Sequence, residues 1–453
     1  MTNPHFDPSS LHPNAAAAID ADGRALVEAR QVGTITCGKS VFESRRETNA
    51  EITDADLAGE PLLAWSNLAG EIVGRYFPRN GQMVALREDG YRQLRRLVEK
   101  VGAAKPFSSG FSDQFLEVEI FKWWRTTVRA GEAVSLSAHL LVVCAEAISA
   151  RTLLVPLSNL EIERPFRFGD VLVTPIGARL FDDFGADGAA RFPDAASQIR
   201  EEALRMRREY GHLTAVCVEV VGEREFANQR ARVIAADMAD FFRFMSPAAA
   251  SRSIVFACFP YGAEHEPTST VIEVADGKIA HFTSGMVNAG FFRWKLSFQE
   301  LDGHMNDGFR NCAVFFSDKI LTGFQRRVKT AISAYTHGIA ATDVRNRLIY
   351  AMSAAEHLLL RDGNEPIQSN VGERMAFLIS RTAEERFAIA TNFKKAYGLR
   401  SRHIHHLSTI DNDDVLDKFF EHMFLMLTAA MDNMQRYKEH LDFLDALDRI
   451  KFS

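Results

Sequence analysis

Proline almost disappears from the last third of this chain, and this constrains the fold more than any other feature of the sequence. Of 14 prolines in 453 residues, only Pro366 lies after residue 310. Proline breaks helices because it lacks a backbone N–H and clashes with the preceding turn, so a stretch without it can form long helices. We predict that residues 311–453 form an all-α helical bundle.

Apolar spacing in this region supports helices. One stripe has helical spacing and ends shortly before Gly363: Val344, Leu348, Met352, Ala355 and Leu359. Further helices are predicted at about 371–380 and 383–399, and the second leads directly into Arg400. The acidic run at 411–414 predicts the start of a long final helix, because negative charge is favourable at a helix N-terminus.

The residues before this region have a mixed character. Their pattern predicts strands at 153–157 and 170–174 and a charged helix at 198–210. It also predicts a hairpin at 271–282 that turns through Asp276-Gly277. We therefore predict a mixed α/β region over residues 29–310. Three early prolines, Pro4, Pro8 and Pro13, indicate a flexible N-terminal arm over residues 1–28. The predicted fold class is α+β.

Composition narrows the class of protein. The net charge of −6 indicates no surface that binds nucleic acid or membrane as a whole, so an RNA site must be a local patch. The five cysteines lie far apart without CxxC spacing, and we expect reduced thiols, no metal site and no cofactor. The N-terminus lacks the pattern of a signal peptide, and no apolar run reaches membrane-spanning length, so we expect a cytoplasmic protein without membrane contact.

The segment from Arg400 to His406 combines a permanent cation with titratable rings. Arg400 precedes His405 by five residues and His406 by six. Imidazole can take the proton of a ribose 2'-hydroxyl, and guanidinium can neutralise charge on the phosphate, so the pattern suits RNA cleavage without a metal. A five-residue step turns a helix by about 140°, so the pair converges only if the helix ends near Ser401 or if a second subunit completes the site. The alternative is a basic helix end favoured by the helix dipole.

The C-terminal 120 to 140 residues resemble the HEPN superfamily, in particular the ApeA-like HEPN domain of bacterial phage-defence proteins. Three pieces carry the resemblance: a helix over 348–359 with Glu356 before its terminal leucines, Arg374-x-Ala376-x-Leu378, and Tyr397-x-x-Arg400-Ser401-x-x-x-His405.

The resemblance implies a helical bundle that forms a homodimer and cleaves RNA without a metal, leaving 2',3'-cyclic phosphate ends. It implies that Arg400 contacts phosphate, that His405 is the acid or base, and that Ser401 is the polar residue that follows the arginine. This chain has His406 where the family has a small residue, and the spacing from Arg400 to His406 is also permitted. Either imidazole can therefore be the catalytic one.

Two further features accompany this motif. Lys394, Lys395 and Arg402 belong to a basic run that can either bind RNA phosphates or form an ordinary solvated face. Glu356 lies at the edge of its apolar stripe, where a partly buried carboxylate needs a partner. It can orient Arg400 or His405, but Arg345 and Arg374 can satisfy it equally well.

Residues 33–40 fit the G-x-x-x-x-G-K-[ST] pattern of a phosphate-binding loop, with Gly38, Lys39 and Ser40 as its candidate nucleotide ligands. The preceding residues 26–32 are not the buried apolar strand that such a loop follows. A hairpin turn at Cys37-Gly38-Lys39 explains the same residues.

Together these features favour an endoribonuclease that cuts cellular RNA, such as tRNA, in anti-phage abortive infection. The N-terminal region would then sense a phage-derived or nucleotide trigger, because an unregulated ribonuclease kills its host. One alternative is a non-catalytic HEPN protein that dimerises and binds RNA or nucleotide. A second alternative is a phosphate-loop NTPase that uses residues 33–40.

Overall fold

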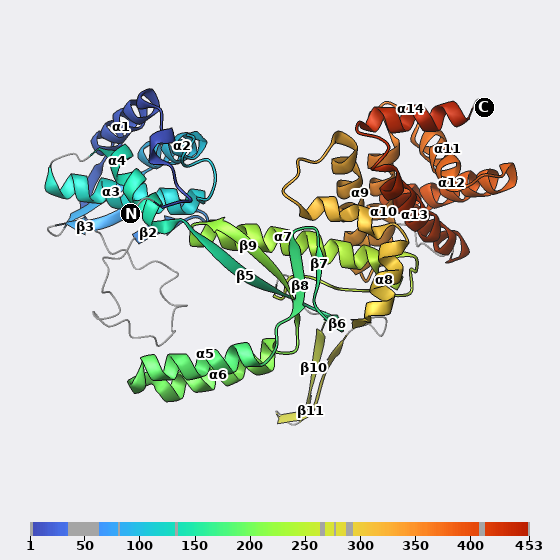
Figure 1. The fold of residues 1–453 in the computed structure, drawn as a ribbon, viewed down its shortest axis with the longest axis horizontal. Coiled ribbons are helices and arrows are strands. Elements are labelled where there is room, and N and C mark those ends of the chain that lie inside the picture. The colour runs from blue at the N-terminus through green and yellow to red at the C-terminus, as the bar shows by residue number, and fades with distance from the viewer. Residues whose placement is uncertain are drawn as a thin grey trace. The chain divides into compact units, whose positions relative to one another are not determined.

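The computed structural model describes residues 3–34, 63–79, 82–131, 135–262, 268–275, 278–286, 293–406 and 413–451 (Figure 1). The chain is an α+β protein, as predicted. It divides into two compact units: Met1–Arg151 with Glu219–Arg230, and Thr152–Val218 with Ala231–Ser453. This division does not coincide with a boundary at residue 310, because the C-terminal helices share a unit with about half of the preceding mixed region.

The first unit combines helices with a small antiparallel sheet. Its helices are α1 (Pro13–Glu28), α2 (Asp89–Ala103), α3 (Asp113–Ala130) and α4 (Leu136–Ala147). Its strands are β1 (Gln31–Thr34), β2 (Leu63–Ser66), β3 (Ile72–Arg79) and β4 (Gln82–Arg87), in the order β1-β4-β3-β2. The core between them contains Trp124, which is fully buried and donates its indole N–H to the carbonyl oxygen of Leu26 at 3.0 Å.

The prediction of a flexible arm is wrong for residues 3–28. A short 3-10 helix (Pro8–Ser10) and α1 replace it, and Pro13 stands in the first turn of α1, where a missing N–H costs nothing. Phe6, Ile19 and Leu26 are buried in the core of the first unit. These residues therefore belong to a helix that packs on the core, not to a flexible arm.

A second sheet has the strand order β5-β9-β8-β7. Its strands are β5 (Ser149–Leu157), β7 (Phe166–Phe168), β8 (Val171–Pro175) and β9 (Thr214–Gly222). The predicted strands at 153–157 and 170–174 are confirmed as β5 and β8. The short strand β7 was not predicted, and it joins β8 through Gly169, whose φ of +60° favours glycine.

Helices and short strands complete the mixed region. The predicted helix at 198–210 is α6 (Ala196–Tyr210), which pairs with α5 (Arg179–Arg191), and α7 (Arg224–Met245) follows β9. The predicted hairpin is also confirmed, because β10 (Thr268–Ala275) pairs antiparallel with β11 (Lys278–Met286).

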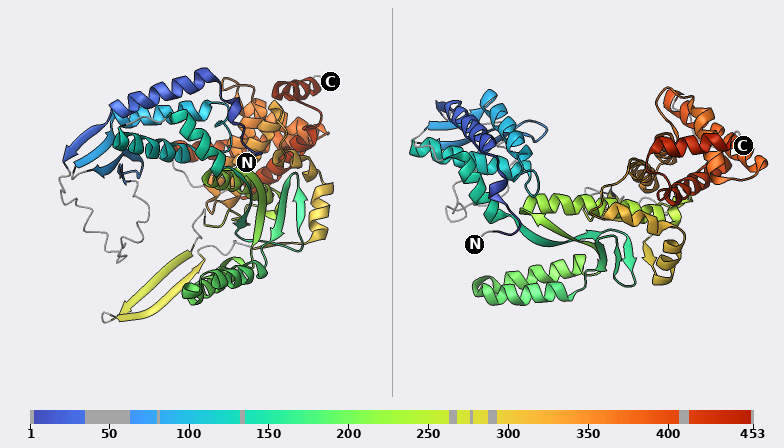
Figure 2. Two further views of the ribbon diagram at one scale, coloured as in Figure 1. Left: turned by 60° about the vertical axis from the view of Figure 1, so that its left-hand side comes forward. Right: turned by 45° about the horizontal axis from the view of Figure 1, so that its top comes forward.

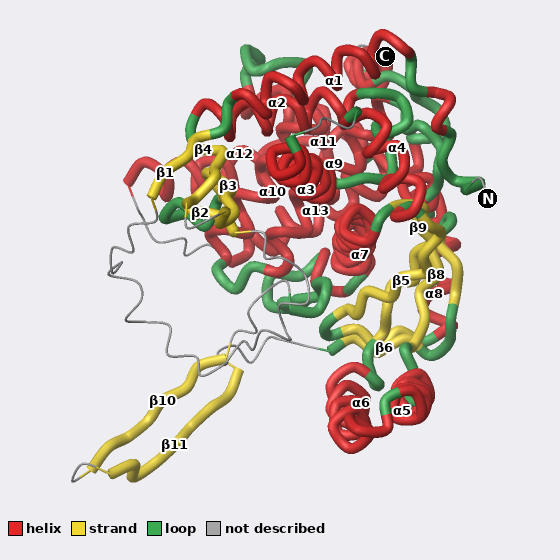
Figure 3. Tube along the Cα trace, turned by 90° about the vertical axis from the view of Figure 1, so that its left-hand side faces the viewer, coloured by secondary structure: helices red, strands yellow, loops and turns green. Residues whose placement is uncertain are grey.

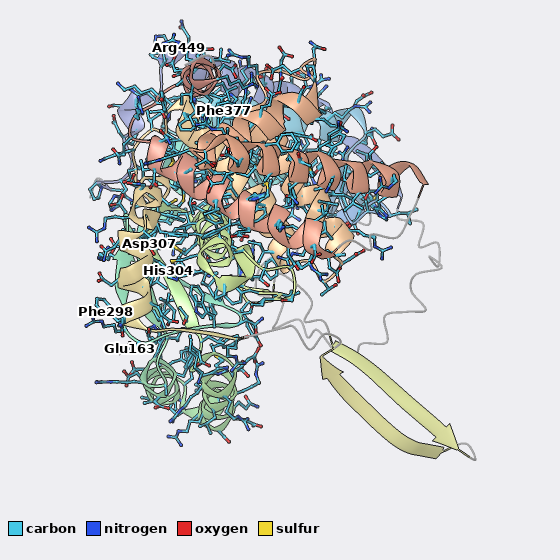
Figure 4. All side chains as sticks on the ribbon, turned by 90° about the vertical axis from the view of Figure 1, so that its right-hand side faces the viewer. Glu163, Phe298, His304, Asp307, Phe377 and Arg449 are labelled. Carbon is cyan, nitrogen blue, oxygen red and sulfur yellow. The ribbon has the colours of Figure 1, made fainter. Side chains whose placement is uncertain are left out.

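Helix α8 (Phe298–Asn306) follows a parallel pair of strands, β6 (Leu160–Ile162) and β12 (Trp294–Leu296). Ser297 and Glu300 form a capping box at its start. The backbone N–H of Phe298 also donates to Glu163 Oε2 at 2.7 Å, which joins α8 to the residue after β6 (Figure 4).

The C-terminal region is helical, as predicted (Figures 2 and 3). Its helices are α9 (Gly323–Ala340), α10 (Val344–Leu359), α11 (Ile367–Ile379), α12 (Ala383–His406), α13 (Asp413–Asn433) and α14 (His440–Ile450). Helix α11 starts directly after Pro366, earlier than predicted. Helix α12 continues through Gly398 and past Leu399 to His406, and no proline follows to stop it.

An ion cluster around Arg374 joins α10, α11 and α14. All five N–H donors of this buried guanidinium are used, on the carbonyl oxygen of Leu359 and on the carboxylates of Glu365 and Asp448. Arg361 donates to Asp448 at 2.9 Å as well. These hydrogen bonds, those from Arg374 first, hold the pKa of Asp448 at about 2, against an ordinary value of 3.8.

This pKa predicts how the cluster responds to acid. A depressed pKa contributes stability above about pH 4, and the contribution is lost as the pH falls towards 2. We expect Asp448→Asn to lower the free energy of unfolding by about 2 kcal/mol at pH 6, and by much less near pH 2.5. Urea unfolding at both values measures this. Exposed Asp362→Asn is the control, and equal losses at both pH values would contradict the assignment.

Candidate functional site

Arg400 lies near the C-terminal end of α12 with its guanidinium half-buried. Its Cζ is 5.8 Å from the centre of the Tyr397 ring, one turn earlier on the same helix. Its Nε is buried without a hydrogen-bond partner among the described residues. A buried donor without a partner is costly, so this N–H is able to take an acceptor from a ligand.

Glu356 is the acidic counterpart of Arg400, on α10. Helix α10 buries Leu348, Met352 and Ala355, which fixes the helix against its neighbours and leaves Glu356 half-buried at the edge of this apolar face. Burial raises the pKa of Glu356, and the charge of Arg400 opposes that rise. Glu356 Oε1, like Arg400 Nε, is buried without a hydrogen-bond partner in the described residues.

The two other arginines that could have satisfied Glu356 are engaged elsewhere. Arg345 donates through Nε to Asp343 at 2.9 Å, at the start of α10. Arg374 uses all its donors in the cluster with Glu365 and Asp448. Arg400 is therefore the arginine of the three whose charge acts on Glu356, so α10 and α12 bring together two of the predicted site residues.

The continuity of α12 determines how Arg400 can approach His405 or His406. The helix does not end near Ser401, which is half-buried within it. On a continuous helix, His405 stands about 140° and His406 about 120° from Arg400. The backbone of both histidines belongs to the last turn of α12, but their side chains lie outside the described part of the structure. Of the two routes to convergence, completion by a second subunit remains.

His403 was not predicted as a site residue, although it shares a helix face with Arg400. Three residues turn a helix by about 300°, so His403 stands only about 60° from Arg400. Burial acts to raise the pKa of nearby Asp343. Hydrogen bonds and the charge of Arg345, followed by the charge of His403, outweigh this effect and lower the pKa. The i, i+3 spacing in the sequence is the signal that could have identified it.

The predicted RNA-binding residues Lys394, Lys395 and Arg402 are all exposed on α12. They do not form one compact patch, because Lys394 and Lys395 differ by about 100° around the helix. Lys394 lines an open depression between α11 and α12 together with Tyr397, the residue beside Arg400. Tyr397 therefore connects the depression that Lys394 lines to the candidate site at Arg400.

A neutral histidine adjoins Glu356. Arg327 on α9 donates through Nη1 to His357 Nδ1 at 2.9 Å, so this ring nitrogen acts as an acceptor. Burial, together with the charge of Arg327, lowers the pKa of His357 to about 4. His357 is therefore a structural hydrogen-bond acceptor near the site. No motif in the sequence predicted this role.

The candidate nucleotide ligands Gly38, Lys39 and Ser40 lie outside the described residues. The residues that lead into them are Gly33 and Thr34, which end β1. This strand is at the edge of an antiparallel sheet, paired with β4, and Val32 within it is 56% exposed. A phosphate-binding loop instead follows a buried strand in a strand–loop–helix unit.

The described residues contain neither a metal site nor a membrane-spanning helix. In the part of the chain that the structure describes, no three His, Cys, Asp or Glu side chains are grouped so that they could hold a metal ion. None of the helices described is both long enough and apolar enough to cross a membrane.

Comparisons of the chain with protein-family models, with curated proteins and with solved structures found no match.

The raised pKa of Glu356 predicts an unusual response to removal of its charge. A group whose pKa is raised on folding makes the folded state less stable as the pH rises above its ordinary value of 4.5. We expect Glu356→Gln to be more stable than the wild type at pH 7.5, with the advantage lost near pH 4. Urea unfolding checks this, with exposed Glu384→Gln as the control. A variant that is less stable at pH 7.5 would show that the carboxylate has a stabilising partner.

Proposed function

We propose that this chain is a metal-independent endoribonuclease of HEPN type that acts in anti-phage abortive infection. The observation that carries the proposal is the electrostatic coupling of half-buried Glu356 to half-buried Arg400, each with a polar atom that has no hydrogen-bond partner among the described residues, near a helix end that bears Ser401, His405 and His406. In this proposal the carboxylate attracts the guanidinium, whose donors remain available for a phosphate.

The proposed reaction is a transesterification. His405 or His406 takes the proton of a ribose 2'-hydroxyl, and the 2'-oxygen forms a bond to the adjacent phosphorus. The bond from phosphorus to the 5'-oxygen then breaks, and this oxygen receives a proton from an imidazolium. Arg400 neutralises the negative charge on the phosphate in the transition state. The products are a 2',3'-cyclic phosphate and a 5'-hydroxyl.

We propose that the active form is a homodimer through the C-terminal helices. The step of about 140° from Arg400 to His405 on a continuous helix separates the two groups within one chain. In a two-fold dimer the same surface occurs twice, so Arg400 of one chain can face the imidazole of the other. Lys394, Lys395 and Arg402 would add phosphate contacts that weaken with salt.

The remaining parts of the proposal concern regulation and location. The α/β region before the C-terminal helices would hold the enzyme inactive until it meets a phage-derived or nucleotide trigger. The RNA target, such as tRNA, and the trigger would both be met in the cytoplasm.

One observation favours a different function, a non-catalytic HEPN protein that dimerises and binds RNA or nucleotide. The same helix phase that separates Arg400 from His405 would leave each motif as a set of phosphate contacts if dimerisation did not bring the two groups together. Such a protein would bind RNA tightly and leave it intact.

Cleavage of total RNA in EDTA tests the proposal. We expect Arg400→Ala to lower the cleavage rate by at least about 100-fold, because it removes the group that neutralises the transition state. We expect a similar loss for either His405→Ala or His406→Ala, which identifies the acting ring.

His403→Ala is the matched control, since it removes a neighbouring imidazole on the face of Arg400. Undiminished cleavage by Arg400→Ala would end the proposal. Tight binding of RNA by the wild type without cleavage would establish the non-catalytic alternative. Loss of activity in His403→Ala alone among the histidine variants would assign the acid or base role to that ring instead.

A further inference from the structure

An open depression lies between the start of α11 and the outer face of α12. Its lining includes Ile367, Phe387, Ala390, Lys394 and Tyr397. Apart from Tyr397, these residues played no part in the resemblance or in the proposed chemistry, and only Lys394 was predicted to bind RNA. The depression borders the candidate site, because Tyr397 contacts the guanidinium of Arg400.

Phe387 is the most exposed aromatic side chain of the C-terminal helices, at 77%. A single exposed apolar residue is ordinary on a protein surface and needs no explanation by itself. This ring, however, shares its depression with a second aromatic residue, Tyr397. An exposed ring beside a second aromatic residue and a cation is an arrangement on which an unpaired base can stack.

The depression has one cationic side chain that is free of the neighbouring ion pairs. Its two acidic residues are both ion-paired, Glu365 with Arg374 at 2.7 Å and Glu373 with Lys451 at 2.8 Å, and both of these cations also pair with Asp448. Lys394 is exposed and has no ion-pair partner among the described residues. An uncompensated lysine between aromatic rings favours a negatively charged, flat-faced ligand over an apolar surface of another protein.

The depression is aligned with the end of α12. Seven residues turn a helix by nearly two full turns, so Phe387, Lys394 and Ser401 lie within about 40° of one another along α12. His405 continues the same line four residues later. The rise of about 1.5 Å per residue places Lys394 roughly 10 Å from Ser401 along the axis, a distance that a few nucleotides can span.

We propose that this depression is a binding site for single-stranded RNA next to the cleaved bond. Phe387 and Tyr397 stack on bases, and Lys394 contacts a phosphate. This inference rests on the proposed function, since it names the form of substrate that the same enzyme takes. Stacking does not distinguish one base from another, so the site selects unpaired strands, such as loops, rather than a sequence.

The test is binding of a short 2'-O-methyl oligoribonucleotide to the full chain, measured by fluorescence anisotropy in EDTA. The methyl group blocks the attacking oxygen, so binding is measured without cleavage. We expect Phe387→Ala to weaken binding at least about fivefold through loss of stacking. We expect Lys394→Gln to weaken binding as well. The slope of log affinity against log salt concentration should become shallower by about 1, which corresponds to the loss of one phosphate contact.

Two substitutions away from the depression are matched controls. Phe184→Ala removes a half-exposed ring on α5, and Lys319→Gln removes the charge of another exposed lysine. Neither should change binding. Unchanged affinity in both depression variants, or absence of binding by the wild type, would overturn the inference. So would conversion of Phe387→Ala to a monomer in light scattering, because the ring would then belong to an interface between two copies of the chain.

The two proposals fail in different ways. Cleavage of RNA by the wild type, combined with unaltered oligonucleotide affinity in both variants, would leave the nuclease proposal standing without this site. Weakened affinity in both variants of a protein that never cleaves RNA would establish the site and reject the nuclease.

Discussion

The electrostatic attraction between Glu356 on α10 and Arg400 on α12 is the interaction on which the proposed site depends. Both residues are half-buried, and each has a buried polar atom without a hydrogen-bond partner among the described residues. Arg374, which donates to the carbonyl oxygen of Leu359 at the end of α10, has all its donors satisfied. Arg374 therefore has no donor left for a ligand, whereas Arg400 Nε can still donate to one.

The continuity of α12 is the second constraint, because it separates Arg400 from His405 and His406 within one chain. A helix that ended at Ser401 could have folded His405 back on Arg400 within one chain. Because α12 runs to His406, helix geometry puts the positions of His405 and His406 about 140° and 120° from Arg400 within one chain. Catalysis by these groups therefore requires a second copy, whereas phosphate binding does not.

The sequence was sufficient for elements with a strong local signal. Helical spacing without proline predicted the C-terminal helices, and Asp276-Gly277 predicted the β10–β11 hairpin. Early prolines were misleading at residues 3–28, because Pro13 starts a helix as readily as it interrupts one. The arginine whose charge acts on Glu356 could not be predicted, since Arg345, Arg374 and Arg400 were equivalent until packing placed two of them beside other acids. The HEPN resemblance and its roles stay predictions.

Complementation between inactive subunits tests the central claim most directly. Arg400→Ala and His405→Ala proteins (or His406→Ala, if that ring proves to be the active one) are unfolded together, refolded as a mixture and assayed for RNA cleavage in EDTA. If each site takes its arginine from one chain and its imidazole from the other, half of the dimers are mixed and each has one intact site. Activity should then return to about a quarter of the wild-type level. Mixed dimers that stay inactive, beside refolded wild type that is active, would contradict a site shared between two chains.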